Sequence, residues 1–448
     1  MLAAIGLTSI DQLFAAIPPS VRLDRALNLP PAVSEWELEK HLRELADKNA
    51  NVHTHLSFLG GGMYQHHIPA VVDAIVDRGE FLTAYTPYQP EMSQGLLQGL
   101  AEYQESIAAI TGLPLVNCSG YDGATAFADS AWMACLITGK RVIAMAESVW
   151  PQWKKVVHTA MSARGVAVVQ IASDPATGLV DRAEMESCLT RNDIAGFLFQ
   201  SPNAFGCLES TSEIAAACKG NQVISSLSFH PFLSGMFKTP GEVGIDIATC
   251  EGQSLGIPMS AGGAGLGVFA TRKQYRAHLP GRLVGKVADI HGVPAYALVY
   301  EDREQHVARE RATSNICSNQ ALHSLRAAVY LSLLGEDGFS KVAGLNAAKA
   351  HYLADQLCRI DGVRLARSAP FFNEFLLELP CSARLLIQRL ASQGIFPGLD
   401  LSADFPALTN CLLVAVTEVK TRAELDRMAQ VMRSELRLPS MENSGDKR

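Results

Sequence analysis

Residues 83–100 combine aromatic, polar and acidic side chains in a short stretch that two prolines stiffen. The stretch reads TAYTPYQPEMSQGLLQGL, and its candidate contact residues are Tyr85, Tyr88, Gln89 and Glu91. Pro90 suits the first turn of a helix because its missing N–H is not needed there, so we expect a helix from near Glu91. Stiff loops of this kind suit contact with a ligand or a partner. The alternative is a loop whose tyrosines only pack.

A second polar stretch begins at Arg303 and includes His306. It is charged as far as Arg311 and then enters a polar turn, Thr313-Ser314-Asn315, before a long apolar stretch. We hypothesise that Ser314 and Asn315 lie where two domains join, near a subunit contact. For Arg309 and Arg311, a solvated helical face is an equally good interpretation.

Other patterns that could do chemistry are incomplete. His53, His55, His66 and His67 lie close in sequence, but no cysteine or carboxylate supports them, so we predict no metal site. The run GGAGLG at 262–267 lacks the third glycine of a dinucleotide fingerprint, so we predict no bound NAD. Neither the G-x-S-x-G elbow of hydrolases nor a phosphate-binding P-loop is present.

The elements that must position these residues alternate between strand and helix from about residue 65 to 310. Six runs are rich in strand formers, at Val142–Ala146, Val166–Ile171, Gly196–Phe199, Val223–Leu227, Ile245–Thr249 and Gly267–Ala270. Helical stretches such as Ala124–Leu136 and Thr211–Cys218 lie between them. This alternation predicts an α/β domain with a mostly parallel sheet.

The pattern changes after this domain. Helices are expected at Asn319–Leu334, Ala347–Arg359 and Ala423–Leu436, and strands at Val363–Ala366, Glu374–Leu379 and Leu412–Val416. We therefore predict an arm at 1–64, a large α/β domain at 65–318, a smaller α+β domain at 319–440 and a disordered tail at 441–448. In the arm, Ser34 and Glu37 have the spacing of a helix capping box.

The composition is that of a globular protein, with 48% apolar and 19% charged residues. The net charge of −7 and the lack of a basic block argue against nucleic acid or an anionic membrane surface as a partner. No apolar run is long enough to span a membrane, and the chain is predicted to be cytoplasmic. The ten cysteines form no C-x-x-C pair, so we expect buried free thiols.

Several of these motifs resemble those of one family, the P-protein of the glycine cleavage system. The similar stretches are TAYTPYQPEMSQG at 83–95, NCSGYDGATA at 117–126, QSPNAFG at 200–206 and DREQHVARERATSNICSNQAL at 302–322. The resemblance covers almost the whole chain. The length matches the family's separate alpha subunit, rather than its fused form of about twice this length.

The resemblance implies a fold-type I pyridoxal phosphate (PLP) transferase architecture, in agreement with the domains predicted above. It also implies decarboxylation of glycine, in which PLP is the electron sink. The aminomethyl group that remains passes to the lipoyl arm of the H-protein. The family further implies an α2β2 assembly, in which the beta subunit carries PLP.

The family's catalytic lysine is missing at its expected place. That place lies in IDIATCEGQSLGIPMSAGG, 245–263, where Gln253 and Ser254 replace a His-Lys pair. A serine cannot form the Schiff base, and the nearest lysines in sequence, Lys238 and Lys286, lie outside the segment. We therefore expect no covalent PLP in this chain, although N–H groups near Gly123 could hold a phosphate weakly.

The sequence also departs from the family pattern. Around the lost site, FHPFLSGMFKTPG at 229–241 lacks the Asp-Pro expected near its start, and Ala264-Gly265 replaces Pro-His. Two alternatives therefore stay open beside the alpha subunit: a non-catalytic scaffold or regulator, and a paralogue acting on another amino acid. A self-sufficient PLP enzyme that uses a different lysine is a third.

Overall fold

The computed structural model describes residues 1–437, so the tail predicted at 441–448 lies outside the described residues. The chain forms two compact units, which divide between Thr54 and His55. The first unit contains the short helices Leu2–Ile5 and Ile10–Phe14 and the helix α1, Glu35–Ala46. The predicted capping box is confirmed, because the Glu37 N–H donates to Ser34 Oγ and the Ser34 N–H donates to Glu37 Oε2.

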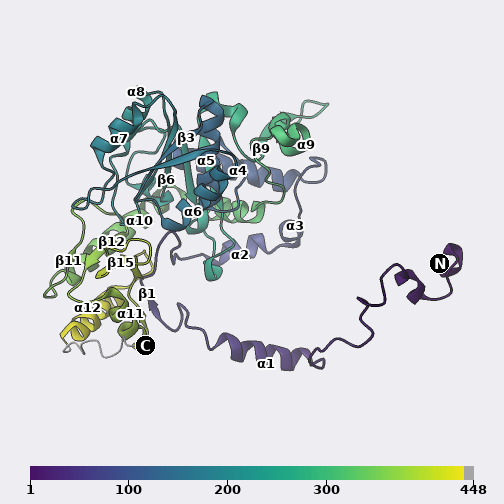
Figure 1. The fold of residues 1–448 in the computed structure, drawn as a ribbon, viewed down its shortest axis with the longest axis horizontal. Helices are drawn as coiled ribbons and strands as arrows, with labels where there is room; N and C mark the ends of the chain where they lie inside the picture. The colour runs from purple at the N-terminus through teal and green to yellow at the C-terminus, as the bar shows by residue number, and fades with distance from the viewer. Residues whose placement is uncertain (438–448) are drawn as a thin grey trace. The chain divides into compact units, whose positions relative to one another are not determined.

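A seven-stranded sheet forms the centre of the second unit (Figure 1). Its strands are β2 Leu115–Val116, β3 Val142–Ala146, β4 Ala167–Ile171, β5 Ile194–Ser201, β6 Ile224–Phe229, β7 Ile247–Glu251 and β8 Gly267–Thr271. Their order is β2-β8-β7-β6-β5-β3-β4. The strand β8 pairs antiparallel with both β7 and β2, and the other neighbouring strands pair in parallel. Every residue of β5 and β6 is buried, as expected for strands covered on both faces. The predicted mostly parallel sheet is confirmed.

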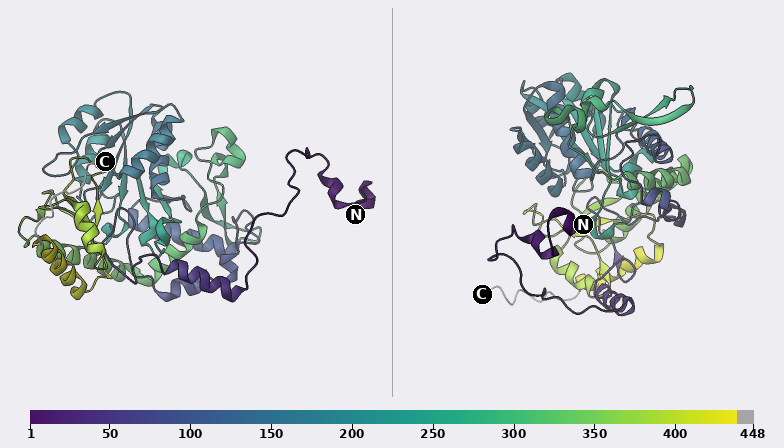
Figure 2. Two further views of the ribbon diagram at one scale, coloured as in Figure 1. Left: turned by 60° about the horizontal axis from the view of Figure 1, so that its bottom comes forward. Right: turned by 90° about the vertical axis from the view of Figure 1, so that its right-hand side faces the viewer.

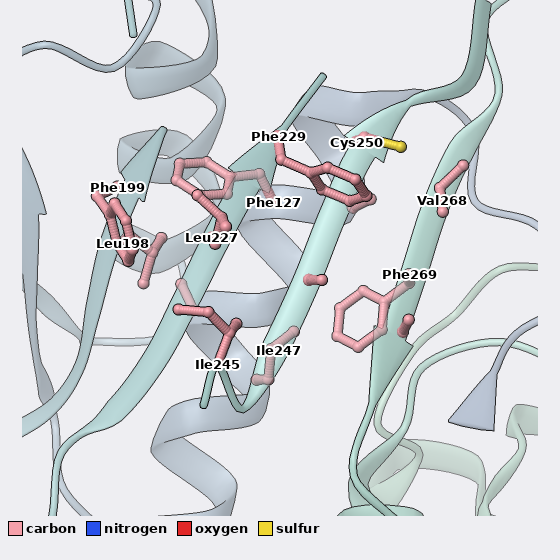
Figure 3. Packing of buried hydrophobic residues seen from close by; sticks show 14 of the residues in the cluster. Phe127, Leu198, Phe199, Leu227, Phe229, Ile245, Ile247, Cys250, Val268 and Phe269 are labelled. Atoms are coloured by element: carbon pink, nitrogen blue, oxygen red, sulfur yellow. The ribbon is translucent and has the colours of Figure 1, made fainter. Parts of the chain in front are cut away.

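Helices pack against this sheet and complete the main core. They are α4 Gln94–Thr111, α5 Gly123–Thr138, α6 Pro151–Ser162, α7 Arg182–Leu189 and α8 Thr211–Gly220. Figure 3 shows part of this core, where Phe127 of α5 lies beside Leu227 and Phe229 of β6. This packing holds the start of α5 beside the end of β7.

Shorter elements precede and follow the main sheet. The helices α2 Ala70–Val76 and α3 Gly79–Leu82 lead into the 83–100 segment. The strands β9 Leu283–Ala288 and β10 Pro294–Val299 form an antiparallel hairpin that extends away from the sheet (Figure 2, right). Single turns of helix include η3 Pro231–Gly235, η4 Gly252–Ser254, η6 Lys273–His278, η7 Glu301–Arg303, α9 Gln305–Ala308 and η8 Arg309–Arg311.

The C-terminal part has a four-stranded antiparallel sheet in the order β11-β12-β15-β14, drawn in yellow-green in Figure 1. Its strands and helices are β11 Arg364–Leu365, β12 Glu374–Glu378, α11 Ala383–Ala391, β14 Leu399–Asp400, β15 Cys411–Ala415 and α12 Arg422–Arg437. The strand β1, Leu56–Ser57, pairs with β13, Ile395–Phe396, so the chain just after the first unit packs with this C-terminal part.

The two helices expected at 319–334 and 347–359 are one long element, α10, Ala321–Leu357. Gly335, with φ of 59° and ψ of −174°, interrupts it with a kink. The predicted end of the first helix at Leu334 is therefore confirmed, whereas the second helix begins well before the predicted Ala347. In this second helix Phe339 packs on Phe232 of η3 with ring centroids 4.8 Å apart.

The ten cysteines are all free. Most are buried or half-buried as expected, but Cys317 and Cys358 are exposed, which corrects the prediction that the thiols are buried. Among residues 1–437, no helix is both long and apolar enough to cross a bilayer. In the same range, no three His, Cys, Asp or Glu side chains are arranged to hold a metal ion.

Candidate functional site: a charged junction and the turn at Ser254

The segment that contains Tyr85, Tyr88, Gln89 and Glu91 is an exposed loop before α4. Tyr85 is 72% exposed and Tyr88 is 44% exposed. The helix begins at Gln94 rather than near Glu91, so the predicted helix start was wrong. The Gln94 side chain explains the later start, because its Nε2 donates to the Pro90 carbonyl at 2.7 Å and holds residues 90–93 as a turn.

A buried arginine anchors this loop. Arg282, which is 2% exposed, donates from Nη2 to the Tyr88 hydroxyl, and its guanidinium lies 4.9 Å from the centre of the Tyr88 ring. Its Nε also lies 3.6 Å from the carboxylate of Glu304. Burial raises the pKa of Glu304, while Arg303 and Arg282 oppose that shift. The buried ion pair of Arg282 and Glu304 thus fixes the position of the exposed Tyr88.

The two polar stretches found in the sequence meet at this loop. The Tyr85 hydroxyl and Ser318 Oγ are 2.9 Å apart, and the ring of His306 lies 6.2 Å from that of Tyr88. Ser314 is half-buried and accepts a hydrogen bond from the Ile316 N–H, whereas Asn315 is exposed. The structure therefore brings the two segments together before α10 begins. The role of Ser314 and Asn315 at a subunit contact stays a prediction.

Ser254 lies on the turn η4, directly after β7, and is buried. Its neighbour Gln253 is fully engaged: Oε1 accepts from the Tyr64 N–H, and Nε2 donates to the carbonyls of Tyr64 and Ile257. Ligands of open α/β sheets bind at the carboxyl ends of parallel strands, so this is where a cofactor would be expected. An amide and a hydroxyl stand here in place of a reactive amine.

The start of α5 lies beside this end of β7, and a carboxylate already accepts the hydrogen bond from its first N–H group. The Gly123 N–H donates to Glu251 Oε2 at 2.9 Å, and Asp122 caps the helix through the Thr125 N–H. The N–H of Gly123 is therefore not free for a phosphate, contrary to our expectation. Burial raises the pKa of Glu251 to about 7. Whenever Glu251 is ionised, it repels an anion from the helix start that would otherwise attract one.

His230 occupies the start of the segment where an Asp-Pro pair was expected. It is buried, its Nδ1 accepts a hydrogen bond from the Phe232 N–H, and burial holds its pKa well below the usual value. PLP enzymes use an acidic partner for the protonated ring nitrogen. A neutral imidazole cannot supply that negative charge. The residues at this end of the sheet thus do not fit PLP at the lysine, at the ring nitrogen or at the phosphate.

Other lysines do not replace the missing one. Lys238 is exposed, and Lys286 on β9 pairs with Glu105 at 2.8 Å. Lys420 was not among the candidate residues predicted from the sequence. In the structure it lies next to Gln65, the residue that follows Tyr64. Its Nζ lies 2.7 Å from Gln65 Oε1, and burial lowers its pKa. No local motif marks Lys420, because only the tertiary structure brings it near residues 64–65.

Glu374 on β12 is a buried carboxyl that contacts residues 61 and 64. Glu374 accepts from the Tyr64 hydroxyl at 2.6 Å and from the Gly61 N–H at 2.8 Å. Burial raises its pKa to about 7 despite these bonds. These hydrogen bonds hold residues 60–64 against the C-terminal sheet. They thereby fix the position of Tyr64, which hydrogen-bonds Gln253.

This raised pKa predicts a pH-dependent stability. Between the unfolded and folded pKa values the native carboxyl keeps its proton and the unfolded one does not. The stabilisation is therefore full at low pH and is lost as pH rises from about 4.5 to about 7. Glu374→Gln, which stays uncharged, should remove this part of the pH dependence, worth about 3 kcal/mol at roughly 1.4 kcal/mol per pKa unit. Urea unfolding at several pH values from 5 to 8 measures it.

The matched control is Glu378→Gln on the same strand, whose side chain is 37% exposed. Its pH profile should run parallel to that of the wild type. Asp129, Glu209 and Glu251 also have pKa values raised to about 7, so the comparison depends on the difference between profiles. If the Glu374→Gln and wild-type profiles run parallel, the assignment to Glu374 is wrong.

Comparison with known proteins gives a consistent result. The profile of the "Glycine cleavage system P-protein" family matches residues 1–432. A probable glycine dehydrogenase (decarboxylating) subunit 1 of Moorella thermoacetica is 43% identical over 97% of this chain and 96% of its own length. The corresponding protein of Chlorobium limicola is 46% identical over 96% of each chain.

Solved structures agree with this. A crystal structure of glycine decarboxylase (P-protein) of the glycine cleavage system, in inhibitor-bound form, superposes with a TM-score of 0.89. It is 36% identical and covers 97% of each chain. A NifS-like protein, with a TM-score of 0.63 and 13% identity over 85% of this chain and 99% of its own, shares only the fold.

Proposed function

The chain belongs to the glycine cleavage system P-protein family, and from this premise we infer that it is subunit 1, the alpha subunit, of a decarboxylating glycine dehydrogenase. The relatives that carry this subunit name cover nearly the whole chain. The main supporting observation is the turn at Ser254, which lies where a cofactor would be expected but lacks the amine, the acidic ring partner and the free helix start. The scaffold and paralogue alternatives have no observation in their favour.

The cofactor belongs to the partner on this proposal. A beta subunit bears the lysine and PLP, and the two subunits form an α2β2 assembly. When bound there, PLP supplies an electron sink for the loss of CO2 from glycine. The assembled enzyme passes the aminomethyl group to the lipoyl arm of the H-protein. A cytoplasmic location stays a prediction.

This chain would contribute the loop of Tyr85, Tyr88, Gln89 and Glu91 to the partner's glycine site. Exposed aromatic residues gathered in one segment are typical of interaction surfaces. The loop is also preorganised, since Arg282 holds Tyr88 and Ser318 holds Tyr85 before any partner binds. Preorganised loops lose less entropy on binding, and they keep substrate-facing groups in position.

Tyr88→Phe should lower glycine decarboxylation by the reconstituted pair about 10-fold, since a small displacement of a positioning group can cost as much as 100-fold. Phenylalanine keeps the ring but removes the hydroxyl that accepts from Arg282. Glu91→Gln should also lower the rate, by removing an exposed charge from the same loop. Exchange of CO2 with glycine, in the presence of H-protein, measures both.

Tyr352→Phe is the matched control. It removes a tyrosine hydroxyl that bonds Asp426 at 2.5 Å, between α10 and α12. Its turnover should equal that of the wild type, and all variants should keep the wild-type circular dichroism spectrum. Wild-type rates in both Tyr88→Phe and Glu91→Gln would remove the support for this loop's role.

A further inference from the structure

A cavity of about 440 Å³ lies between η6 and the segment η7–η8. Its basic lining residues are Arg276, His278, Arg303 and Arg311, and its acidic one is Asp302. Leu136, Ala277, Tyr300, Ala308 and Thr313 complete the wall. With His278 neutral, the lining carries three positive charges and one negative charge. A cavity of this size is suited to a small molecule.

Arg303 has unused hydrogen-bonding capacity in this wall. The residue is 9% exposed, and its Nη1 donates to the carbonyls of Leu279 and Gly281, each at 2.5 Å. Its Nε and Nη2 have no hydrogen-bond partner, and its closest carboxylate, on Glu304, is 3.9 Å away. Burial lowers its pKa, which reflects the cost of keeping this charge away from water. Because Nε and Nη2 are buried, Arg303 contributes its positive charge to the cavity rather than these N–H donors.

The other two arginines, Arg276 and Arg311, are exposed and available to a ligand. Arg276 stacks on the Tyr300 ring with its guanidinium carbon 4.1 Å from the ring centre. Stacking orients the guanidinium without consuming its N–H donors. Within the described residues 1–437, neither Arg276 nor Arg311 forms an ion pair with a carboxylate. Three guanidinium groups thus line one cavity, and Asp302 is the carboxylate that lines it with them.

We propose that this cavity is a binding site for an oxyanion, the phosphate or carboxylate group of a small molecule. Guanidinium groups bind both through paired, charge-assisted N–H···O bonds, and several of them together favour a group with more than one charged oxygen. An oxyanion seated here accepts from the exposed guanidinium groups of Arg276 and Arg311 and balances the excess positive charge, to which the buried Arg303 adds. This site is separate from the turn at Ser254 and does not depend on the proposed function.

The experiment titrates the purified full-length chain by calorimetry with sodium phosphate and, separately, with sodium acetate, at constant ionic strength kept with sodium chloride. Constant ionic strength removes general screening from the comparison. We expect saturable binding of at least one of these anions. Arg276→Gln and Arg311→Gln should each weaken it about 10-fold, the loss of roughly one charge-assisted hydrogen bond. Both side chains are exposed, so neither change should unfold the chain.

Arg309→Gln is the matched control, because Arg309 belongs to the same helical turn but does not line the cavity. It should leave the affinity unchanged. Tighter binding of phosphate would identify the ligand class as a phosphate ester, and tighter binding of acetate would identify it as a carboxylate. The proposal is overturned if neither anion binds saturably, or if Arg309→Gln weakens binding as much as Arg311→Gln does.

Discussion

The isolated chain, incubated with PLP and reduced with borohydride, should carry no stoichiometric pyridoxyl group on any lysine. It should also release no CO2 from glycine. A Schiff base needs an uncharged amine close to the aldehyde carbon, and Ser254 offers only a hydroxyl. Glu251 blocks the helix start of α5, and His230 cannot balance a protonated ring nitrogen. Mass mapping of the reduced chain, together with its visible absorbance, measures this.

Addition of a lysine-bearing beta subunit should restore both the visible band and, with H-protein present, CO2 exchange. The change is one from background to full activity, so it is the largest effect predicted for this chain. The control is the beta subunit alone, which should hold PLP but decarboxylate poorly without the loop of Tyr85 and Tyr88. A stoichiometric adduct on Lys420 or Lys238, accompanied by activity without a partner, would contradict the subunit assignment.

Much of the large sheet could be predicted because its central strands are short buried runs rich in strand-forming residues. The run Val142–Ala146 matches β3 at both ends, and β5 and β6 extend only a few residues beyond their predicted limits. Three elements of the C-terminal part, the helix α11 and the strands β13 and β14, were not predicted. The strand β14 is only two residues long, and such short edge strands have too few residues to show an alternating pattern.

The site was predictable only in part, for a different reason. The unusual composition of the 83–95 and 302–322 stretches identified them, but nothing local shows that Tyr85 meets Ser318 or that Arg282 meets Tyr88. Arg282 stands alone between a proline-glycine turn and an apolar strand, without a motif. Likewise, only the pairing of β7 with β8 places Glu251 against the start of α5. Contacts between residues this far apart in sequence depend on topology.

Arg282→Leu should lower the free energy of unfolding by about 3–5 kcal/mol, because breaking a buried ion pair leaves the other charge without compensation. The side chains of Arg282 and Glu304 are 3% and 6% exposed, so water cannot solvate the Glu304 carboxylate in place of the lost guanidinium group. Glu304 Oε1 already lacks a hydrogen-bond partner, which increases its dependence on the neighbouring guanidinium groups. Urea unfolding, with the Tyr88 loop probed by limited proteolysis, measures both the global and the local effect.

The control is Arg364→Leu, which breaks an exposed Arg–Glu pair with Glu378 at 2.8 Å and should cost at most about 1 kcal/mol. Addition of Glu304→Gln to Arg282→Leu tests the cause directly. If the loss arises from an uncompensated carboxylate, the double variant should regain part of the stability; if it arises from lost packing, it should not.

The loss of stability caused by Arg282→Leu should also lessen as pH falls. Removal of Arg282 takes away an opposing influence on the raised pKa of Glu304, so the native carboxyl becomes protonated more readily than the unfolded one. Equal losses for Arg282→Leu and Arg364→Leu would show that the buried pair does not anchor the loop.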